Sequence, residues 1–397
     1  MRRISILTIS MTATFLASIA SAAETPPAIG ESLKAITAVS REGAGNDAAA
    51  KAWKSLVAAG APALLPTLSA IDSEKPAAAN WLRTLVDALA EAEKKAARPL
   101  PIADMMAFAT DTKRDPAARR IAYELIASVD QNKANELLPK FINDPSIELR
   151  RDAIQKAFQT EMSINRMPDP EILTKLFDAA RDKDQVETIA KALVAREKTP
   201  NITKHYGFIT EWQLVGPFPS PKDGGFTKAQ SPEASVDLGA KYEGSAGPIT
   251  WKYAQSDATY GSMDLNAELG KHKDAAAYAY AVIDATADTP AEIRATTKNA
   301  IRIFVNGKLV FEREEYHHGM KMDQHAARIQ LNKGKNEILL KVCQNNQTDS
   351  WAQDWTLAAR ICDATGGLLP VKQIVRKNGE DRTVELGELK AMKKDSK

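Results

Sequence analysis

The chain has 397 residues, of which 44% are hydrophobic and 26% are charged, a balance typical of folded, water-soluble domains. Removing Arg2 and Arg3 with an expected signal segment leaves 53 − 2 = 51 basic residues against 51 acidic ones. This neutral balance excludes a protein whose whole surface is basic enough to attract nucleic acid. The length suggests two or more domains.

Residues 1–23 predict a secretory signal peptide. Arg2 and Arg3 precede a mostly apolar run at 4–19, and Ala-Ser-Ala at 20–22 offers small residues for cleavage. A membrane anchor is the alternative, but the apolar run is short and contains several Ser and Thr residues. We therefore expect a periplasmic or secreted protein without a membrane anchor after cleavage. No later stretch is long and apolar enough to span a bilayer.

Residues 24–203 predict an α-helical domain, because Ala is abundant and apolar residues recur at helical spacing. Four segments open with a proline that follows an acidic or basic residue: Lys75-Pro76, Asp115-Pro116, Asp144-Pro145 and Asp169-Pro170. Asp as a cap with Pro in the first turn is a helix-start signal.

The runs at 115–122 and 144–154 are alike, and this likeness resembles HEAT-like repeats, in which paired helices stack into a solenoid. That resemblance implies a concave surface for an extracytoplasmic protein partner. A plain helical bundle is the alternative.

The helical pattern ends near Lys198, and residues 204–370 predict an antiparallel β-sandwich. Predicted strands cover 251–253, 276–283, 300–305, 309–311, 327–331, 338–343 and 355–362. Asn306-Gly307 tolerates positive φ and predicts a tight hairpin. We expect a second hairpin in which 332–336 joins its two flanking strands. Residues 219–248 predict loops over the sandwich, and 371–397 predict a charged tail.

Two stretches of the sandwich region resemble a known pattern. Residues 305–310 (Val-Asn-Gly-Lys-Leu-Val) and 331–342 (Leu-Asn-Lys-Gly-Lys-Asn-Glu-Ile-Leu-Leu-Lys-Val) look like the "vNGk…l.kG.N.lllkv" motif of galactose-binding-like and glycosidase sugar-binding-type jelly rolls. Residues 211–218 resemble the "W.viGPF" opening of similar domains in large secreted bacterial proteins. The resemblance spans about 208–365. It implies a jelly roll that binds carbohydrate or serves as a structural module.

The loop after residue 344 offers the best candidate for a glycan site. A sugar needs an aromatic platform and planar polar groups that converge on an apolar concavity. The candidate ligand-binding residues are Trp351, Asn345, Asn346, Asp349, Tyr316 and His317. Alternatively, Trp351 folds back onto the core, as we expect of Trp212 and Trp355.

A metal site is the other possibility in this region. His317, His318 and His325 lie near Glu315 and Asp323, and imidazoles with carboxylates suit zinc. Their spacing fits no helical metal motif, so we predict a polar loop and no metal or cofactor. The resemblance also leaves room for a structural calcium ion on Asp349, Asp354 or Asp363, but no spacing specifies such a site.

Cys343 and Cys362 are the only cysteines, and an oxidising compartment favours a disulfide. If the two last strands formed a hairpin, Cys362 would lie about seven residues from the partner of Cys343, roughly 23 Å at strand rise. A disulfide needs Cα atoms within about 7 Å. Pairing of Cys343 with Cys362 therefore requires non-adjacent strands.

No catalytic motif is present: Gly-x-Ser-x-Gly, His-Glu-x-x-His and a phosphate loop are all missing from the sequence. We therefore expect a non-catalytic binding and scaffold protein rather than an enzyme. One alternative is a glycoside-active enzyme with an unrecognised carboxylate pair, for which Asp323 and Asp349 are the first candidates. Another is a purely structural component of the cell envelope.

Overall fold

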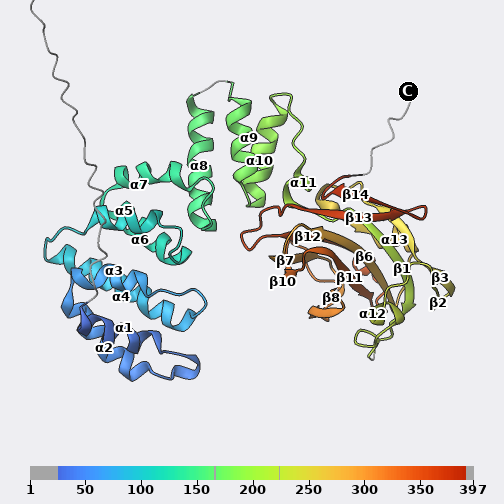
Figure 1. The fold of residues 1–397 in the computed structure, drawn as a ribbon, viewed down its shortest axis with the longest axis horizontal. Coiled ribbons are helices and arrows are strands. Elements are labelled where there is room, and N and C mark those ends of the chain that lie inside the picture. Colours follow the sequence, from blue (N-terminus) through green and yellow to red (C-terminus); the bar gives the residue numbers. More distant parts are fainter. Residues whose placement is uncertain (1–25, 165–166, 223, 390–397) are drawn as a thin grey trace, which may run out of the picture. The chain divides into compact units, whose positions relative to one another are not determined.

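The computed structural model describes residues 26–389 apart from 165–166 and 223 (Figure 1). The predicted signal peptide lies outside the described residues. Helices come first along the chain, and antiparallel strands follow. Within the described residues, no helix is both long enough and apolar enough to cross a membrane. The chain divides into two compact units, Met1–Ala134 and Asn135–Lys397.

The first unit is helical. Its helices are α1 (Pro27–Thr37), α2 (Asn46–Ala59), α3 (Leu64–Ser69), α4 (Pro76–Lys95), α5 (Ile102–Thr110) and α6 (Pro116–Val129). Consecutive helices pack in pairs, α1 with α2, α3 with α4 and α5 with α6. The predicted start at Pro116 is confirmed, since the Asp115 carboxylate accepts the N–H of Ala117 at 2.8 Å. Helix α7 (Gln131–Leu137) spans the boundary between the two units.

The second unit holds four more helices followed by the sheets. The helices are α8 (Ile147–Ile164), α9 (Pro170–Ala179), α10 (Lys183–Val194) and α11 (Ile202–Tyr206). Asp169 caps α9 as predicted, by accepting the N–H of Glu171. Helix α8 begins at Ile147, two residues after the predicted Pro145, because the Asp144 carboxylate accepts the Ser146 N–H at 2.7 Å in a turn before the helix.

Two antiparallel sheets form the sandwich. The larger sheet contains β1 (Glu211–Pro219), β4 (Lys252–Gln255), β6 (Ala275–Ala285), β8 (Ala300–Val305), β9 (Lys308–Arg313), β11 (Gly334–Gln344), β13 (Val371–Lys377) and β14 (Glu380–Glu385). The smaller sheet contains β5 (Met263–Asp264), β7 (Thr289–Thr296), β10 (His325–Leu331) and β12 (Thr356–Cys362). A separate hairpin is formed by β2 (Lys241–Gly244) and β3 (Gly247–Thr250), and the loops carry two short helices, α12 (Ser231–Ala234) and α13 (Leu265–Leu269).

The sequence predicts a domain boundary at 203, whereas the two compact units meet at 134/135. Side chains of α9 and α10, including Leu176 and Ile189, share one apolar core with Tyr206, Phe208 and the strand residue Ala358. Residues 135–203 therefore belong to the same compact unit as the sandwich. Apolar faces of α9 and α10 are covered by the sandwich region, which the helical pattern alone does not reveal.

The predicted strands all occur, but one predicted pairing is wrong. Asn306 and Gly307 have φ of 50° and 75°, as a tight hairpin between β8 and β9 requires. The second expected hairpin does not form, because β10 pairs with β7 whereas β11 pairs with β6 and β8. The link between β10 and β11 crosses from one sheet to the other, and the buried Asn336 amide supports it by donating to the Asn332 carbonyl at 2.8 Å.

The predicted charged tail is wrong for most of its length. Strand β13 pairs with β6 and β14 pairs with β13. Val371, Val375 and Val384 are buried, so alternating apolar residues between the charges build an edge of the larger sheet. The last residues, 390–397, lie outside the described part of the chain.

The core between the sheets contains both tryptophans expected there, Trp212 and Trp355. Cys343 and Cys362 are buried free thiols, so the considered disulfide does not form. The two cysteines lie on β11 and β12, which belong to different sheets, and the hairpin assumed between these strands does not form. Burial raises the pKa of each thiol to about 11.

Candidate functional site

Three loops meet at one end of the larger sheet. Strand β6 begins at Ala275 opposite Gln344, the last residue of β11, so the segments around 274 and 345 are neighbours. Strand β9 ends at Arg313, and the loop that follows it reaches the same place. We call the five residues that gather here the rim cluster: Asp274, Tyr316, His317, Asn345 and Trp351.

His317 and Asn345 form the centre of the rim cluster. The Asn345 Oδ1 accepts the backbone N–H of Gln347 at 3.1 Å, and its Nδ2 donates to Gln347 Oε1 at 2.9 Å. The same Oδ1 accepts a hydrogen bond from His317 Nε2 at 2.6 Å. These contacts fix both side chains, since the amide can satisfy them in only one orientation. Two residues that are 28 apart in sequence thus form one rigid polar pair.

Trp351 does not fold back onto the core, since its side chain is 58% exposed. It lies in a short 3-10 turn, Ser350–Ala352. The Ala352 carbonyl of this turn accepts a hydrogen bond from Lys273 Nζ at 2.7 Å. The ring of His317 meets the indole edge to face, with 5.6 Å between ring centroids and 83° between planes. The indole is therefore oriented by packing while it stays open to solvent.

Asp274 also belongs to the rim cluster, and no sequence pattern predicts it there. Its backbone N–H donates to the Asn345 carbonyl at 3.2 Å, and its φ of 48° is unusual for a residue other than glycine. Among the described residues, the buried Asp274 Oδ1 has no hydrogen-bond partner. An unsatisfied buried carboxylate oxygen is an acceptor for a hydroxyl or amine of a ligand.

The other predicted ligand-binding residues take lesser positions around the cluster. Tyr316 is half-buried beside His317, with 6.3 Å between ring centroids, and burial, then the nearby Cys343 and Glu314, raise the pKa of its hydroxyl. Asn346 and Asp349 are exposed on the same loop as Trp351. Burial lowers the pKa of Lys273, and the Asp349 charge opposes this shift.

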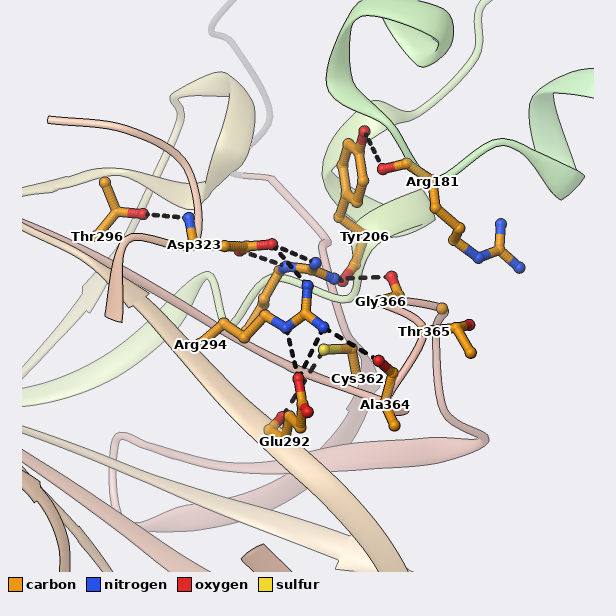
Figure 2. A network of polar contacts seen from close by, with 12 residues as sticks. Arg181, Tyr206, Glu292, Arg294, Thr296, Asp323, Cys362, Ala364, Thr365 and Gly366 are labelled. Atoms are coloured by element: carbon orange, nitrogen blue, oxygen red, sulfur yellow. Dashed lines mark hydrogen bonds and ion pairs between the residues drawn. The ribbon is translucent and has the colours of Figure 1, made fainter. Parts of the chain in front are cut away.

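Asp323, a candidate for a catalytic carboxylate, is instead held in an ion-pair network with two arginines (Figure 2). Its Oδ2 accepts Arg360 Nη2 at 2.6 Å and Arg294 Nη1 at 3.1 Å. Burial would raise the pKa of this carboxyl, but the two arginines together lower it. Both oxygens of Asp323 are occupied by arginines, which leaves no free carboxylate for acid–base chemistry.

The histidines considered as metal ligands do not assemble a site. Among the described residues, no group of three or more His, Cys, Asp or Glu side chains is placed to hold a metal ion. His318 and His325 meet ring to ring at 5.7 Å between centroids. The Gln324 Nε2 lies within hydrogen-bond distance of both rings, 3.1 Å from His325 Nε2 and 3.3 Å from His318 Nδ1.

His325 is expected to make the stability of the second unit depend on pH. It is 2% exposed, and burial, then the charges of His318 and Arg313, lower its pKa to about 4. An unfolded histidine titrates near 6.5, so the unfolded chain binds more protons between these values. The free energy of unfolding should therefore fall as pH falls from about 6.5 to 4, by up to roughly 3 kcal/mol from this group.

Urea unfolding at a series of pH values measures this effect. The variant that tests the assignment is His325→Phe, which removes the titrating imidazole but keeps an aromatic ring against Phe311. The centroids of the His325 and Phe311 rings are 5.2 Å apart. His205, whose pKa burial also lowers to about 4, should retain its own contribution in that variant. An unchanged pH slope in His325→Phe would refute the assignment to His325.

Comparisons with known proteins add little to this geometry. No protein-family model matches the chain, and a search of curated proteins finds no match either. Solved structures with a partial likeness include an anti-sigma factor domain-containing protein, at 11% identity and a TM-score of 0.22 over 46% of this chain and 49% of that one. A GH31 alpha-xylosidase from Xanthomonas citri gives 10% identity and a TM-score of 0.19 over 39% and 16%.

A beta-glucosidase from Kluyveromyces marxianus, solved with glucose, gives 9% identity and a TM-score of 0.26 over 62% of this chain and 33% of that chain. This chain therefore spans half or less of the length of the solved chains that it partly resembles. At these TM-scores the likeness identifies neither a family nor a ligand.

Proposed function

We propose that this chain is an exported, non-catalytic binding and scaffold protein whose β-sandwich binds a glycan at the rim cluster. The observation that carries the proposal is the exposed Trp351 indole, oriented by His317 and set beside polar groups. A sugar ring can stack its C–H face on the indole while its hydroxyls donate to Asp274 Oδ1. The signal-like segment at 1–23 supports an exported location for this activity, in the periplasm or outside the cell.

The proposal includes two finer points of architecture. The sandwich is taken as a jelly roll of the sugar-binding type, in line with the motifs at 305–310 and 331–342. The helices of the first unit are taken as HEAT-like repeats for a protein partner. Their packing in consecutive pairs, α1 with α2, α3 with α4 and α5 with α6, supports this reading.

Trp351→Ala tests the glycan site. We expect the mature chain to bind at least one polysaccharide of a broad panel, and the variant to bind it at least about tenfold more weakly, because truncating a contact tryptophan typically costs about 2 kcal/mol. Affinity gel electrophoresis and calorimetry would measure the change. Trp351 is exposed, so the melting temperature should stay near that of the wild type.

The matched control is Leu309→Ala, which removes another large exposed apolar side chain, 42% exposed on β9. It should leave glycan binding unchanged. Binding that survives Trp351→Ala, or no binding to any glycan, would refute the rim site. Turnover of a bound polysaccharide by the wild-type chain would instead support the glycoside-active alternative.

A further inference from the structure

A cavity of the sandwich lies where β6 changes partners, and no residue of the rim cluster lines it. One edge of β6 pairs with β11 along its whole length. The other edge pairs with β1 as far as Tyr280 and with β13 from Val282 onward. The beginning of β1 and the middle of β13 therefore diverge at one point, and a cavity of about 220 Å³ opens between them. We call it the fork cavity.

Two residues that line the fork cavity each carry a buried acceptor oxygen without a donor. Glu211 and Gln373, 1% and 2% exposed, both line it. Gln373 Nε2 donates to the Glu211 carbonyl at 2.5 Å, which leaves Gln373 Oε1 as an acceptor. Glu211 Oε2 accepts the Tyr253 hydroxyl at 2.5 Å and pairs with Arg382. Within the described residues, neither Glu211 Oε1 nor Gln373 Oε1 has a hydrogen-bond partner.

Buried acceptors without donors are rare in folded proteins, and each one needs an explanation. These two side chains cannot satisfy each other, since carboxylate and amide oxygens only accept. A bound molecule that presents two donors would satisfy both. Gln373 is held by its hydrogen bond to the Glu211 carbonyl, and the Glu211 carboxylate is held by Tyr253 and Arg382, so both acceptors are positioned before such a molecule arrives.

The charges and walls of the cavity favour a neutral molecule. Its acidic residues are Glu211, Glu337 and Asp381, and the basic residues that line it or pair with them are Lys335, Arg376 and Arg382. Because the two signs balance, an ammonium ion or a metal gains no net attraction. Trp212 and Val375 supply apolar wall. The volume is below the ~300–1,000 Å³ of sites for drug-sized ligands, which limits the occupant to about one ring.

We infer that the fork cavity binds a neutral, single-ring polyhydroxyl molecule such as a monosaccharide, with two hydroxyls donating to Glu211 Oε1 and Gln373 Oε1. The Tyr280 hydroxyl donates a hydrogen bond to Glu337 at 2.8 Å, and its oxygen can accept one from a third hydroxyl of the ligand. This site is separate from the rim cluster and does not depend on the glycan proposal. It gives the sandwich a pocket for one sugar ring in addition to an open platform for a chain.

The test is calorimetry on the mature chain with D-glucose, D-galactose and myo-inositol, and with methylammonium chloride as the cationic probe. At least one polyol should bind at millimolar concentrations and methylammonium should not. Gln373→Met should weaken that binding about tenfold, because the buried amide oxygen is lost. Ile374→Trp, which narrows the cavity from its wall without removing either acceptor, should weaken it as well.

Leu309→Ala is the matched control and should leave monosaccharide binding unchanged, and Trp351→Ala is measured beside it. Circular dichroism confirms that each variant is folded. Three results would overturn the inference: no polyol binds, methylammonium binds in a Gln373-dependent way, or polyol binding is lost in Trp351→Ala but kept in both cavity variants. The last result would move the sugar to the rim cluster, so the two sites can fail separately.

Discussion

Asp323→Ala is expected to lower the free energy of unfolding of the second unit by about 3–5 kcal/mol, because it leaves a buried arginine without its counter-ion. Arg360 on β12 is 2% exposed and lies directly opposite Arg294 on β7. Two like charges at facing strand positions repel each other. Asp323 lies between them, bonded to both, with Arg360 Nε at 2.8 Å and Arg294 Nη1 at 3.1 Å (Figure 2).

The same network ties the helices of the second unit to its sheets. Arg360 Nη1 donates to the Tyr206 carbonyl at the end of α11, at 3.1 Å, and to the Gly366 carbonyl at 3.0 Å. Its guanidinium also lies over the Tyr206 ring, 5.2 Å from the centroid. Loss of Asp323 frees Arg360 to leave this position, so the contact between α11 and the smaller sheet should loosen with it.

Urea unfolding and hydrogen exchange of residues 202–208 and 356–362 would measure both effects. Asp184→Ala is the matched control: Asp184 also pairs with an arginine through two oxygens, at 2.8 and 2.5 Å, but its side chain is 65% exposed. That substitution should cost less than about 1 kcal/mol. Equal costs for the two substitutions would show that the buried network is not what stabilises the interface.

Local patterns in the sequence were enough to find the strands, but not their partners. Alternation along Ile301, Ile303 and Val305 depends only on neighbouring residues and predicts β8 correctly. The segment 332–336 reads equally well as a hairpin turn and as a link between sheets. Its role depends on which distant strands pair with β11, and β6 and β8 occupy both edges of β11. The same long-range pairing turned the predicted tail into β13 and β14.

The residues of the candidate site also fall into two groups, those that local sequence predicts and those that depend on strand pairing. Trp351, Asn345 and His317 were predicted because aromatic and amide residues gather within short loops. Asp274 was missed because it joins them only through the pairing of β6 with β11. Glu211 and Gln373 are 162 residues apart, and no sequence pattern predicts that their strands share an edge of β6. A site built by sheet order is therefore visible only in the folded chain.

Sheet order also explains a fully buried lysine on the outer face of the larger sheet. Lys341 on β11 is 0% exposed. Its Nζ donates to the carbonyls of Phe226 and Lys228, at 2.9 and 2.7 Å, and to Glu233 Oε1 at 3.2 Å. Glu233 also accepts the Tyr278 hydroxyl at 2.5 Å and Arg302 Nη1 at 3.1 Å. One ammonium group thus fastens the loop after β1 across the sheet.

Lys341→Ala should release this loop and lower the free energy of unfolding by about 3–5 kcal/mol, because the buried Glu233 loses a counter-ion and two buried carbonyls lose their donor. Lys341→Met fills the same space without the charge. Comparing it with Lys341→Ala should show how much of the lost stability comes from packing and how much from the ion pair. Glu233 keeps Arg302 in both variants, so the methionine variant should lose less stability than the alanine variant. Limited proteolysis at residues 224–230 and urea unfolding would measure the release. A loop that stays protected in both variants would show that Phe226 and its apolar neighbours, rather than the lysine, hold it to the sheet.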